Sequence, residues 1–131
     1  ISLIQLAFEP SDPISSAPQW QDQSPHHLLI TSGLLDQQTP SSTADALAMA
    51  ALVPQIEPIT NDLWRHELES LAPQSGRLIN NASYSNHQVT AAYRQSGSGD
   101  HFVIFKSVPI RRMVLRFLTN CAAGEPIVAS R

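Results

Sequence analysis

Residues 26–33, HHLLITSG, form a short, continuous apolar run that ends at a glycine. Because the run does not alternate with polar residues and contains β-preferring Ile and Thr, it predicts a strand covered on both faces, as in a parallel sheet. Residues 39–54, TPSSTADALAMAALVP, predict a helix after a short loop. Thr39 is its expected N-cap, Pro40 its first residue and Pro54 its stop. A buried strand followed by a capped helix is half of a βαβ unit, so the sequence predicts an α/β fold.

Two further segments predict helices. Residues 61–71, NDLWRHELESL, carry apolar residues at spacings near 3.6, as on one side of a helix. A final helix is expected to begin after its cap, Ser107, and to end at Gly124. The apolar stripe of this final helix consists of Ile110, Met113, Val114 and Phe117. Residues 9–25 hold four prolines, which predicts an irregular surface connection.

A hairpin and a glycine-rich loop precede the final helix. Residues 87–95, HQVTAAYRQ, predict a strand, and residues 77–84, RLINNASY, are expected to pair with it across Ser85 and Asn86. The chain then passes through SGSGD, residues 96–100, before the apolar stretch that begins at His101. This order places a histidine loop directly after a predicted strand.

Asp36 and His101 occupy the loops in which an α/β sheet usually displays its functional groups. Asp36 lies three residues beyond the first strand, and His101 lies six residues beyond the last predicted strand. A carboxylate that accepts a hydrogen bond from one imidazole nitrogen fixes the tautomer and stabilises the imidazolium formed when the other nitrogen takes a proton. The two residues are therefore a candidate acid–base pair. Purely structural roles stay open as well: Asp36 as a turn or cap residue, His101 as a core histidine, and Asp100 as a turn residue.

These two segments resemble the α/β-hydrolase superfamily. HLLITSGLLDQQTPSSTADALAMAA resembles its penultimate-strand region, and VTAAYRQSGSGDHFVIF, with the helix that ends in FLTNCAAGEPIV, resembles its last strand, histidine loop and terminal helix. The resemblance covers about residues 20–128 and is greatest to secreted bacterial lipases and esterases. It implies the role of triad acid for Asp36 and of triad base for His101, in the order that this superfamily uses.

Two features depart from the superfamily pattern. The interval 53–88 is longer than the usual single helix and short connection, which implies an insertion that contains the 61–71 helix. No G-x-S-x-G nucleophile elbow occurs, because around Ser98 the glycine positions are taken by Ser96 and Asp100. We therefore expect residues 1–131 to be the C-terminal segment of a single α/β-hydrolase domain, incomplete without an N-terminal part that carries the nucleophile serine.

The resemblance implies a serine hydrolase that cleaves carboxylic esters, either lipids or other apolar acyl esters. It also implies a secreted, periplasmic or cell-envelope location and contact with a lipid interface, and we expect no cofactor. Leu63 and Trp64, in the insertion between the acid and histidine segments, are the candidate substrate-binding residues. The alternative is a non-catalytic α/β subunit with a structural or binding role. A partner that carries G-x-S-x-G would distinguish the first function from the second.

Charge and histidine spacing exclude two other function classes. Lys106 is the only lysine, the seven arginines are scattered and the net charge is −3, so the basic stripe that nucleic-acid binding needs is absent from the sequence. The five histidines include no pair at the i, i+3 or i, i+4 spacing of helical metal ligands, and Cys121 is the only thiol. We therefore expect neither a nucleic-acid partner nor a metal site.

Overall fold

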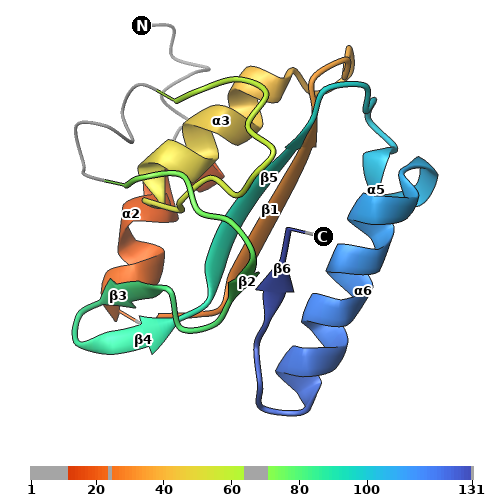
Figure 1. Cartoon of the computed structure of the whole chain (residues 1–131). Helices are drawn as coiled ribbons and strands as arrows, with labels where there is room; N and C mark the ends of the chain where they lie inside the picture. Colours follow the sequence, from red (N-terminus) through yellow and green to blue (C-terminus); the bar gives the residue numbers. More distant parts are fainter. Residues whose placement is uncertain (1–11, 24, 64–70, 131) are drawn as a thin grey trace, which may run out of the picture.

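A computed structural model describes residues 12–23, 25–63 and 71–130 of the chain. Its centre is a pair of parallel strands, β1 (Leu28–Gly33) and β5 (Ala91–Ser96), which lie side by side (Figure 1). Leu28 stands opposite Ala91 at one end of the pair, and Gly33 stands opposite Ser96 at the other. The predicted strand and its place in a parallel pair are confirmed, but residues 28–31 are only partly buried rather than covered on both faces. The described chain has an α/β architecture.

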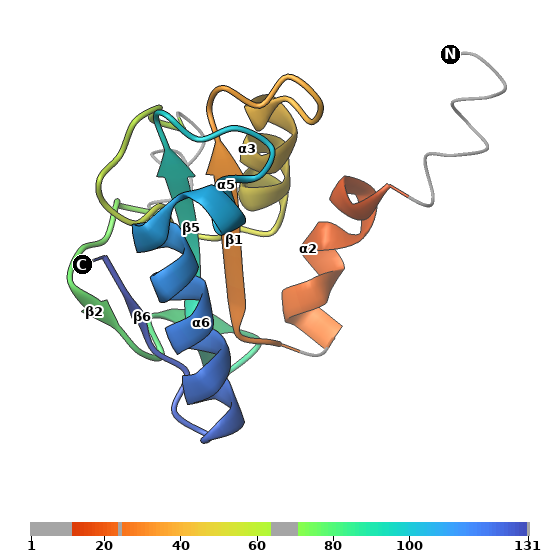
Figure 2. The same cartoon turned by 90° about the vertical axis from the view of Figure 1, so that its right-hand side faces the viewer.

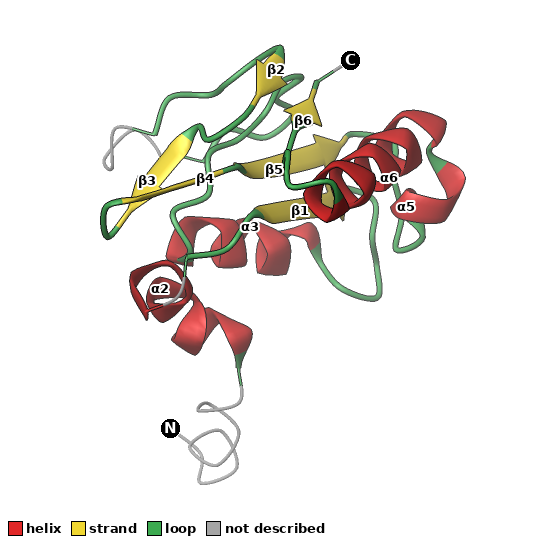
Figure 3. Cartoon of the chain, turned by 90° about the horizontal axis from the view of Figure 1, so that it is seen from below, coloured by secondary structure: helices red, strands yellow, loops and turns green. Residues whose placement is uncertain are grey.

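Helices cover both faces of this strand pair. Helices α2 (Pro13–Gln23) and α3 (Ser41–Ala50) lie on one face, and α5 (Val103–Lys106) and α6 (Val108–Ala122) lie on the other (Figure 3). Because successive side chains of a strand point to opposite faces, Tyr93 of β5 packs toward α3 whereas its neighbour Ala92 packs toward α6. Both strands run in the same direction, so the loops that follow them emerge at the same end of the molecule (Figure 2).

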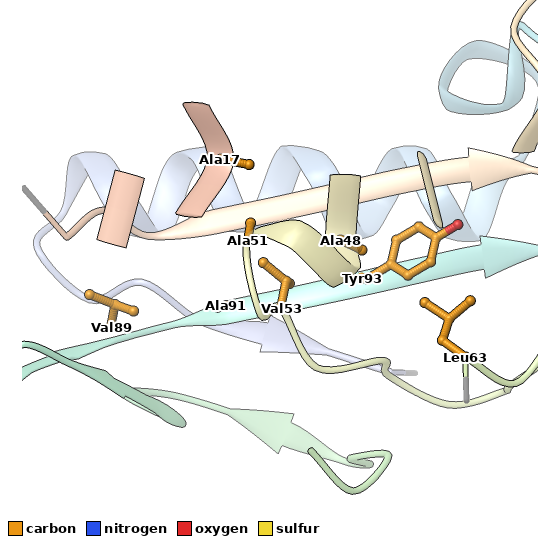
Figure 4. Packing of buried hydrophobic residues seen from close by; sticks show 8 residues of the cluster. All are labelled: Ala17, Ala48, Ala51, Val53, Leu63, Val89, Ala91 and Tyr93. Atoms are coloured by element: carbon orange, nitrogen blue, oxygen red, sulfur yellow. The ribbon is translucent and has the colours of Figure 1, made fainter. Parts of the chain in front are cut away.

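Two apolar clusters fill the space between the strands and the helices. The cluster on the α3 face is shown in Figure 4 and consists of Ala17, Ala48, Ala51, Val53, Leu63, Val89, Ala91 and Tyr93. The cluster on the α6 face consists of Ile56, Leu78, Ala92, Val103, Ile110, Met113, Phe117 and Val128. The core is therefore divided by the strand pair, as expected for a sheet with helices on both sides.

Two short antiparallel pairs lie beside the central strands. Strands β3 (Ala82–Tyr84) and β4 (His87–Val89) form a hairpin across the predicted turn, but it is shorter than the predicted pairing of residues 77–84 with 87–95. The turn residues Ser85 and Asn86 both have positive φ, at 45° and 68°, as a two-residue hairpin turn requires. The second pair joins β2 (Arg77–Leu78) to β6 (Val128–Ala129).

The predicted strand 87–95 is divided at Thr90, where the chain leaves the hairpin and joins the central pair. Thr90 is fully buried, and its Oγ1 donates to the carbonyl of Pro126 at 2.8 Å. Its backbone N–H donates to Nδ1 of His27 at 3.0 Å. The N–H and the hydroxyl of Thr90 therefore pair with His27 and Pro126 rather than with a neighbouring strand. Thr90 thus separates β4 from β5 within the predicted strand.

Helix α6 begins and ends as the sequence predicts. The Oγ of Ser107 accepts a hydrogen bond from the backbone N–H of Ile110, and Gly124, with a φ of +79°, follows the last turn. The residues of the predicted stripe that are buried are Ile110, Met113 and Phe117. Val114 is partly buried beside the same cluster.

Residues 13–23 form a helix, so the prediction of an irregular connection is wrong over this range. The side chain of Asp12 caps the first turn, and Pro13 stands at the first helical position, where a missing N–H costs nothing. Pro18 lies inside the helix, but its neighbour Ala17 is fully buried in the cluster on the α3 face. Packing of one face therefore outweighs the poor helix propensity of the segment.

The predicted N-cap of α3 is wrong, and most of the predicted helix 61–71 lies outside the described residues. Helix α3 has Pro40 at its N-cap position without a side-chain cap, so Thr39 is not the N-cap. The backbone N–H of Thr39 instead donates to the Oδ1 of Asp36. In the predicted helix 61–71, residues 61–63 are irregular, and residues 64–70, including Trp64, lie outside the described residues.

Gly33 and Gly99 bring the loops after β1 and β5 into contact. A Cβ atom added to Gly33 would lie 2.4 Å from both the carbonyl carbon and the oxygen of Gly99. Backbone hydrogen bonds join the loops at the same place: Leu34 N–H donates to the carbonyl of Ser96 at 3.0 Å, and Leu35 N–H donates to that of Gly99 at 2.9 Å. Only a residue without a side chain fits at position 33.

We expect Gly33→Ala to lower the melting temperature more than Gly97→Ala does. A Cβ atom at Gly33 collides with backbone that must move, and such overpacking costs about 1–3 kcal/mol. At the exposed Gly97 the added atom would meet only the side chain of Thr60, at 3.2 Å, so we expect a change within about 0.5 kcal/mol. Thermal unfolding of both variants measures the difference. Equal melting temperatures would show that the close contact of the two loops is not needed for the fold.

Candidate active site

Asp36 and His101 meet in the two loops that follow β1 and β5. The Oδ2 of Asp36 lies 3.0 Å from the Nδ1 of His101. Because a carboxylate oxygen only accepts, Nδ1 is the donor, and the Nε2 of a neutral ring then carries the free lone pair. The side chain of Asp36 is 10% exposed and that of His101 is 40% exposed. The arrangement thus combines a shielded carboxylate with an imidazole that remains accessible.

The other carboxylate oxygen of Asp36 is anchored by the backbone. Its Oδ1 accepts hydrogen bonds from the N–H groups of Gln38 at 2.8 Å and Thr39 at 2.9 Å. The N–H of Asp36 donates to the carbonyl of Gly33 at 3.2 Å, which closes a tight turn directly after β1. One oxygen therefore satisfies the turn while the other faces His101, so the structural and acid roles considered for Asp36 are compatible.

The Asp36 carboxyl group is held in its ionised form. Burial raises its pKa, but the N–H groups of Thr39 and Gln38, together with His101, lower it by more, and the net pKa is below the ordinary value. Because the pKa of Asp36 is lower in the folded state than the unfolded-state value of 3.8, these contacts stabilise the fold above pH 3.8. This stabilisation is lost as the pH falls through the lower pKa of the folded state. Asp36 is therefore a carboxylate throughout the neutral range.

Asp100 shapes the histidine loop, as the sequence predicts. Its Oδ1 accepts the N–H of Phe102 at 2.9 Å, and its Oδ2 pairs with the ammonium group of Lys106. The hydrogen bond from Lys106 is the main reason why the pKa of Asp100 is lowered. The ring of Phe102 stands edge-on to that of His101, with 5.1 Å between the centroids. With both oxygens engaged, Asp100 does not compete with Asp36 for the imidazole.

A cleft of about 210 Å³ opens beside the pair. Its lining consists of Thr31, Ser32, Gly33, Asp36, Thr39, Ala44, Asp100, His101, Val103 and Ile104. The chain neighbours of the pair, Leu35 and Phe102, are exposed large apolar residues, at 61% and 46%. These exposed neighbours, with Val103 and Ile104 of the lining, favour an apolar ligand at this position.

The hydroxyl groups of the described residues are not paired with His101. In the ranges 12–23, 25–63 and 71–130, no hydroxyl group is hydrogen-bonded to the imidazole. Ser32 lines the cleft, but it is only 7% exposed and its Oγ lies 2.6 Å from the hydroxyl of Tyr93. The Tyr93 hydroxyl in turn donates to the buried carboxylate of Asp45. Ser32 thus belongs to a buried polar network rather than to the Asp36–His101 pair.

The two predicted substrate-binding residues are not brought to this pair by the described structure. Leu63 is 4% exposed and packs in the cluster on the α3 face (Figure 4), and it does not line the cleft. Its backbone N–H donates to the Oε1 of Gln55 at 3.1 Å, which fixes the chain at this point. Trp64 lies outside the described residues. A role in substrate binding stays a prediction for both.

Sequence reasoning missed the groups that position the pair. The N–H groups of Gln38 and Thr39 hold the carboxylate, and the contact between Gly33 and Gly99 sets the distance between the two loops. An aspartate that bonds to backbone two residues later is a common turn pattern, so the first of these features was open to prediction. The second depends on two segments distant in sequence, and no local signal reports it.

A scan against protein-family models, a search of curated proteins and a search of solved structures each found no match to this chain. No helix among the described residues is both long and apolar enough to cross a membrane. The same part of the chain contains no group of three or more His, Cys, Asp or Glu side chains placed to hold a metal ion.

Proposed function

We propose that this chain is the acid- and histidine-bearing part of an α/β-hydrolase-type serine hydrolase that cleaves carboxylic esters with apolar acyl groups. The observation that carries the proposal is the hydrogen bond between Asp36 and His101, formed where the carboxyl ends of two neighbouring parallel strands meet. In open α/β sheets this edge is where functional groups gather. The anchored, ionised carboxylate and the accessible imidazole have the relation that a triad requires.

In the proposed mechanism, Nε2 of His101 takes the proton from the Oγ of a serine outside this chain while that Oγ attacks the ester carbonyl carbon. Asp36 stabilises the imidazolium that forms, and His101 then gives the proton to the departing alcohol. The acyl group is left on the serine. Water repeats the sequence with His101 as base and releases the acid. The donors that stabilise the oxyanion would also come from the serine-bearing part.

The open edge of β1 supports the existence of that second part. Among the described residues β1 pairs only with β5, so the backbone groups on its other edge have no strand partner. Its apolar residues Leu28, Leu29 and Ile30 are only half buried here, although parallel strands of this composition are usually fully covered. A further strand from an N-terminal hydrolase part would pair with this edge and complete the sheet.

The surroundings of His101 support apolar acyl esters as the substrate class. Phe102 is exposed beside the imidazole, and Leu35 is exposed next to Asp36 on the opposite loop. Ile104 of α5 is 37% exposed and lines the cleft beside the pair. An acyl chain that contacts these side chains would hold its ester carbonyl near His101. The same surface is suited to contact with a lipid interface.

Labelling with a fluorophosphonate ester tests the proposed function. In the complete protein, the serine Oγ would displace fluoride from phosphorus while His101 accepts the serine proton, and peptide mass mapping would locate the adduct. We expect one labelled serine outside residues 1–131. We also expect His101→Ala to slow labelling by about 10²–10⁴-fold, the usual contribution of a general base. The control His87→Ala changes an exposed histidine of β4 and should leave the rate unchanged.

A different labelling pattern would overturn the proposal. A folded complete protein that takes up no label at any serine would indicate the non-catalytic α/β subunit instead. Labelling at a serine within residues 1–131 would contradict the placement of the nucleophile outside this chain.

A further inference from the structure

Three arginines line a second cavity, which lies beside α6 and has a volume of about 220 Å³. Its lining consists of Arg94, Pro109, Ile110, Arg112, Met113, Arg116 and Ser130. It shares no lining residue with the cleft beside His101. In a chain with a net charge of −3 and eight basic side chains, this is a marked local concentration of positive charge.

The guanidinium of Arg94 is fixed in place by backbone carbonyls. Arg94 is half buried, and its Nη1 donates to the carbonyls of Pro58 at 2.7 Å and Gln95 at 2.8 Å. Burial lowers the pKa of Arg94, because the charged group has lost part of its hydration. In the part of the chain that the structure describes, no carboxylate forms an ion pair with it.

Arg112 and Arg116 add two more charges from one side of α6. They stand four residues apart on this helix, so their side chains are neighbours and repel each other. Neither forms an ion pair with a carboxylate among the described residues. Pro109 and Ile110 of the lining belong to the first turn of α6, where the helix dipole adds partial positive charge. A bound anion would relieve the repulsion between these groups.

We propose that this cavity binds a phosphate group. A guanidinium presents a planar set of donors that matches two oxygens of one phosphate, and three guanidiniums suit a doubly charged group with several acceptor oxygens better than a carboxylate with two. The cavity is smaller than a typical pocket for a drug-sized molecule, of about 300–1,000 Å³, so it fits a phosphate and few further atoms. The site is independent of the chemistry proposed for His101.

Calorimetric titration of the complete protein with inorganic phosphate, at an ionic strength held constant with chloride, tests the site. We expect saturable binding in the millimolar range or tighter. Arg112→Gln and Arg116→Gln should each weaken it about tenfold, because each removes a charge-assisted hydrogen bond. Arg111→Gln removes the same charge from an exposed position of α6 outside the cavity lining, and it should change the affinity by less than about twofold.

A second arm distinguishes the source of the phosphate. Sedimentation with phosphatidic acid vesicles, against phosphatidylcholine vesicles, measures binding to a lipid phosphate. Binding of inorganic phosphate without vesicle binding assigns the site to small soluble phosphates, whereas vesicle binding that requires Arg112 and Arg116 assigns it to a lipid headgroup. The proposal is wrong if neither probe binds, or if Arg111→Gln weakens binding as much as Arg112→Gln and Arg116→Gln do.

Discussion

If the proposed function is right, His101→Ala is expected to lower kcat/KM for a soluble ester by about 10⁴-fold or more in the complete protein, on the scale of triad residues in serine hydrolases. The substitution removes the Nε2 that would take the serine proton, and none of the other histidines that the structure describes lines the cleft. The side chain is 40% exposed, so its loss should change the fold little. Initial rates on a short-chain ester, with a melting curve for each protein, measure the effect.

His87→Ala is the matched control for this variant, because His87 is also exposed but belongs to the β3–β4 hairpin rather than to the cleft. It should retain wild-type kcat/KM. Full activity in a well-folded His101→Ala protein would show that His101 takes no part in ester hydrolysis. It would favour the alternative that this chain is a non-catalytic α/β subunit.

Asp36→Asn is expected to lower kcat by about 10⁴-fold while the protein stays folded. The N–H groups of Gln38 and Thr39 need an acceptor at Oδ1, so the amide oxygen of an asparagine would take that place. Its NH₂ group would then face Nδ1 of His101 and donate to it. The imidazole proton would move to Nε2, which leaves no lone pair there to accept the serine proton.

Asp100→Asn provides the control for the loss of a carboxylate near the imidazole. Asn can still accept the N–H of Phe102, and only the ion pair with Lys106 is lost. Because that pair is exposed, we expect kcat to fall about tenfold or less. A loss for Asp100→Asn as large as that for Asp36→Asn would show that both changes act by disturbing the loop. Unchanged kcat in folded Asp36→Asn would remove Asp36 from the mechanism.

Much of the fold could be predicted because its signals are local. The apolar run in residues 28–33 defines β1, the pair Ser85 and Asn86 defines a hairpin turn, and Ser107 with its apolar stripe defines α6. Each of these features depends on residues within one or two turns of chain. The continuous apolar pattern of residues 26–33 predicts a strand of a parallel sheet, which is observed, but it does not identify β5 as the partner strand.

The remaining features depend on contacts between distant segments. Helix α2 forms despite Pro18 because Ala17 packs into the core, and that packing is invisible in local propensity. Leu63 was predicted to bind substrate, but it is 4% exposed, and its burial depends on packing against distant segments that its local apolar pattern does not report. For the candidate site, the residue types and loop positions of Asp36 and His101 were predictable, whereas their 3.0 Å contact requires the docking of the two loops.

The measurement that tests the central claim most directly is kcat/KM for four forms of the complete protein: wild type, Asp36→Asn, His101→Ala and the double variant. If Asp36 acts only through His101, removing the carboxylate matters little once the imidazole is gone. The double variant should then lie within about threefold of the slower single variant. Losses that multiply, so that the double variant is slower by the product of the two single effects, would contradict the claim that Asp36 and His101 form one catalytic unit.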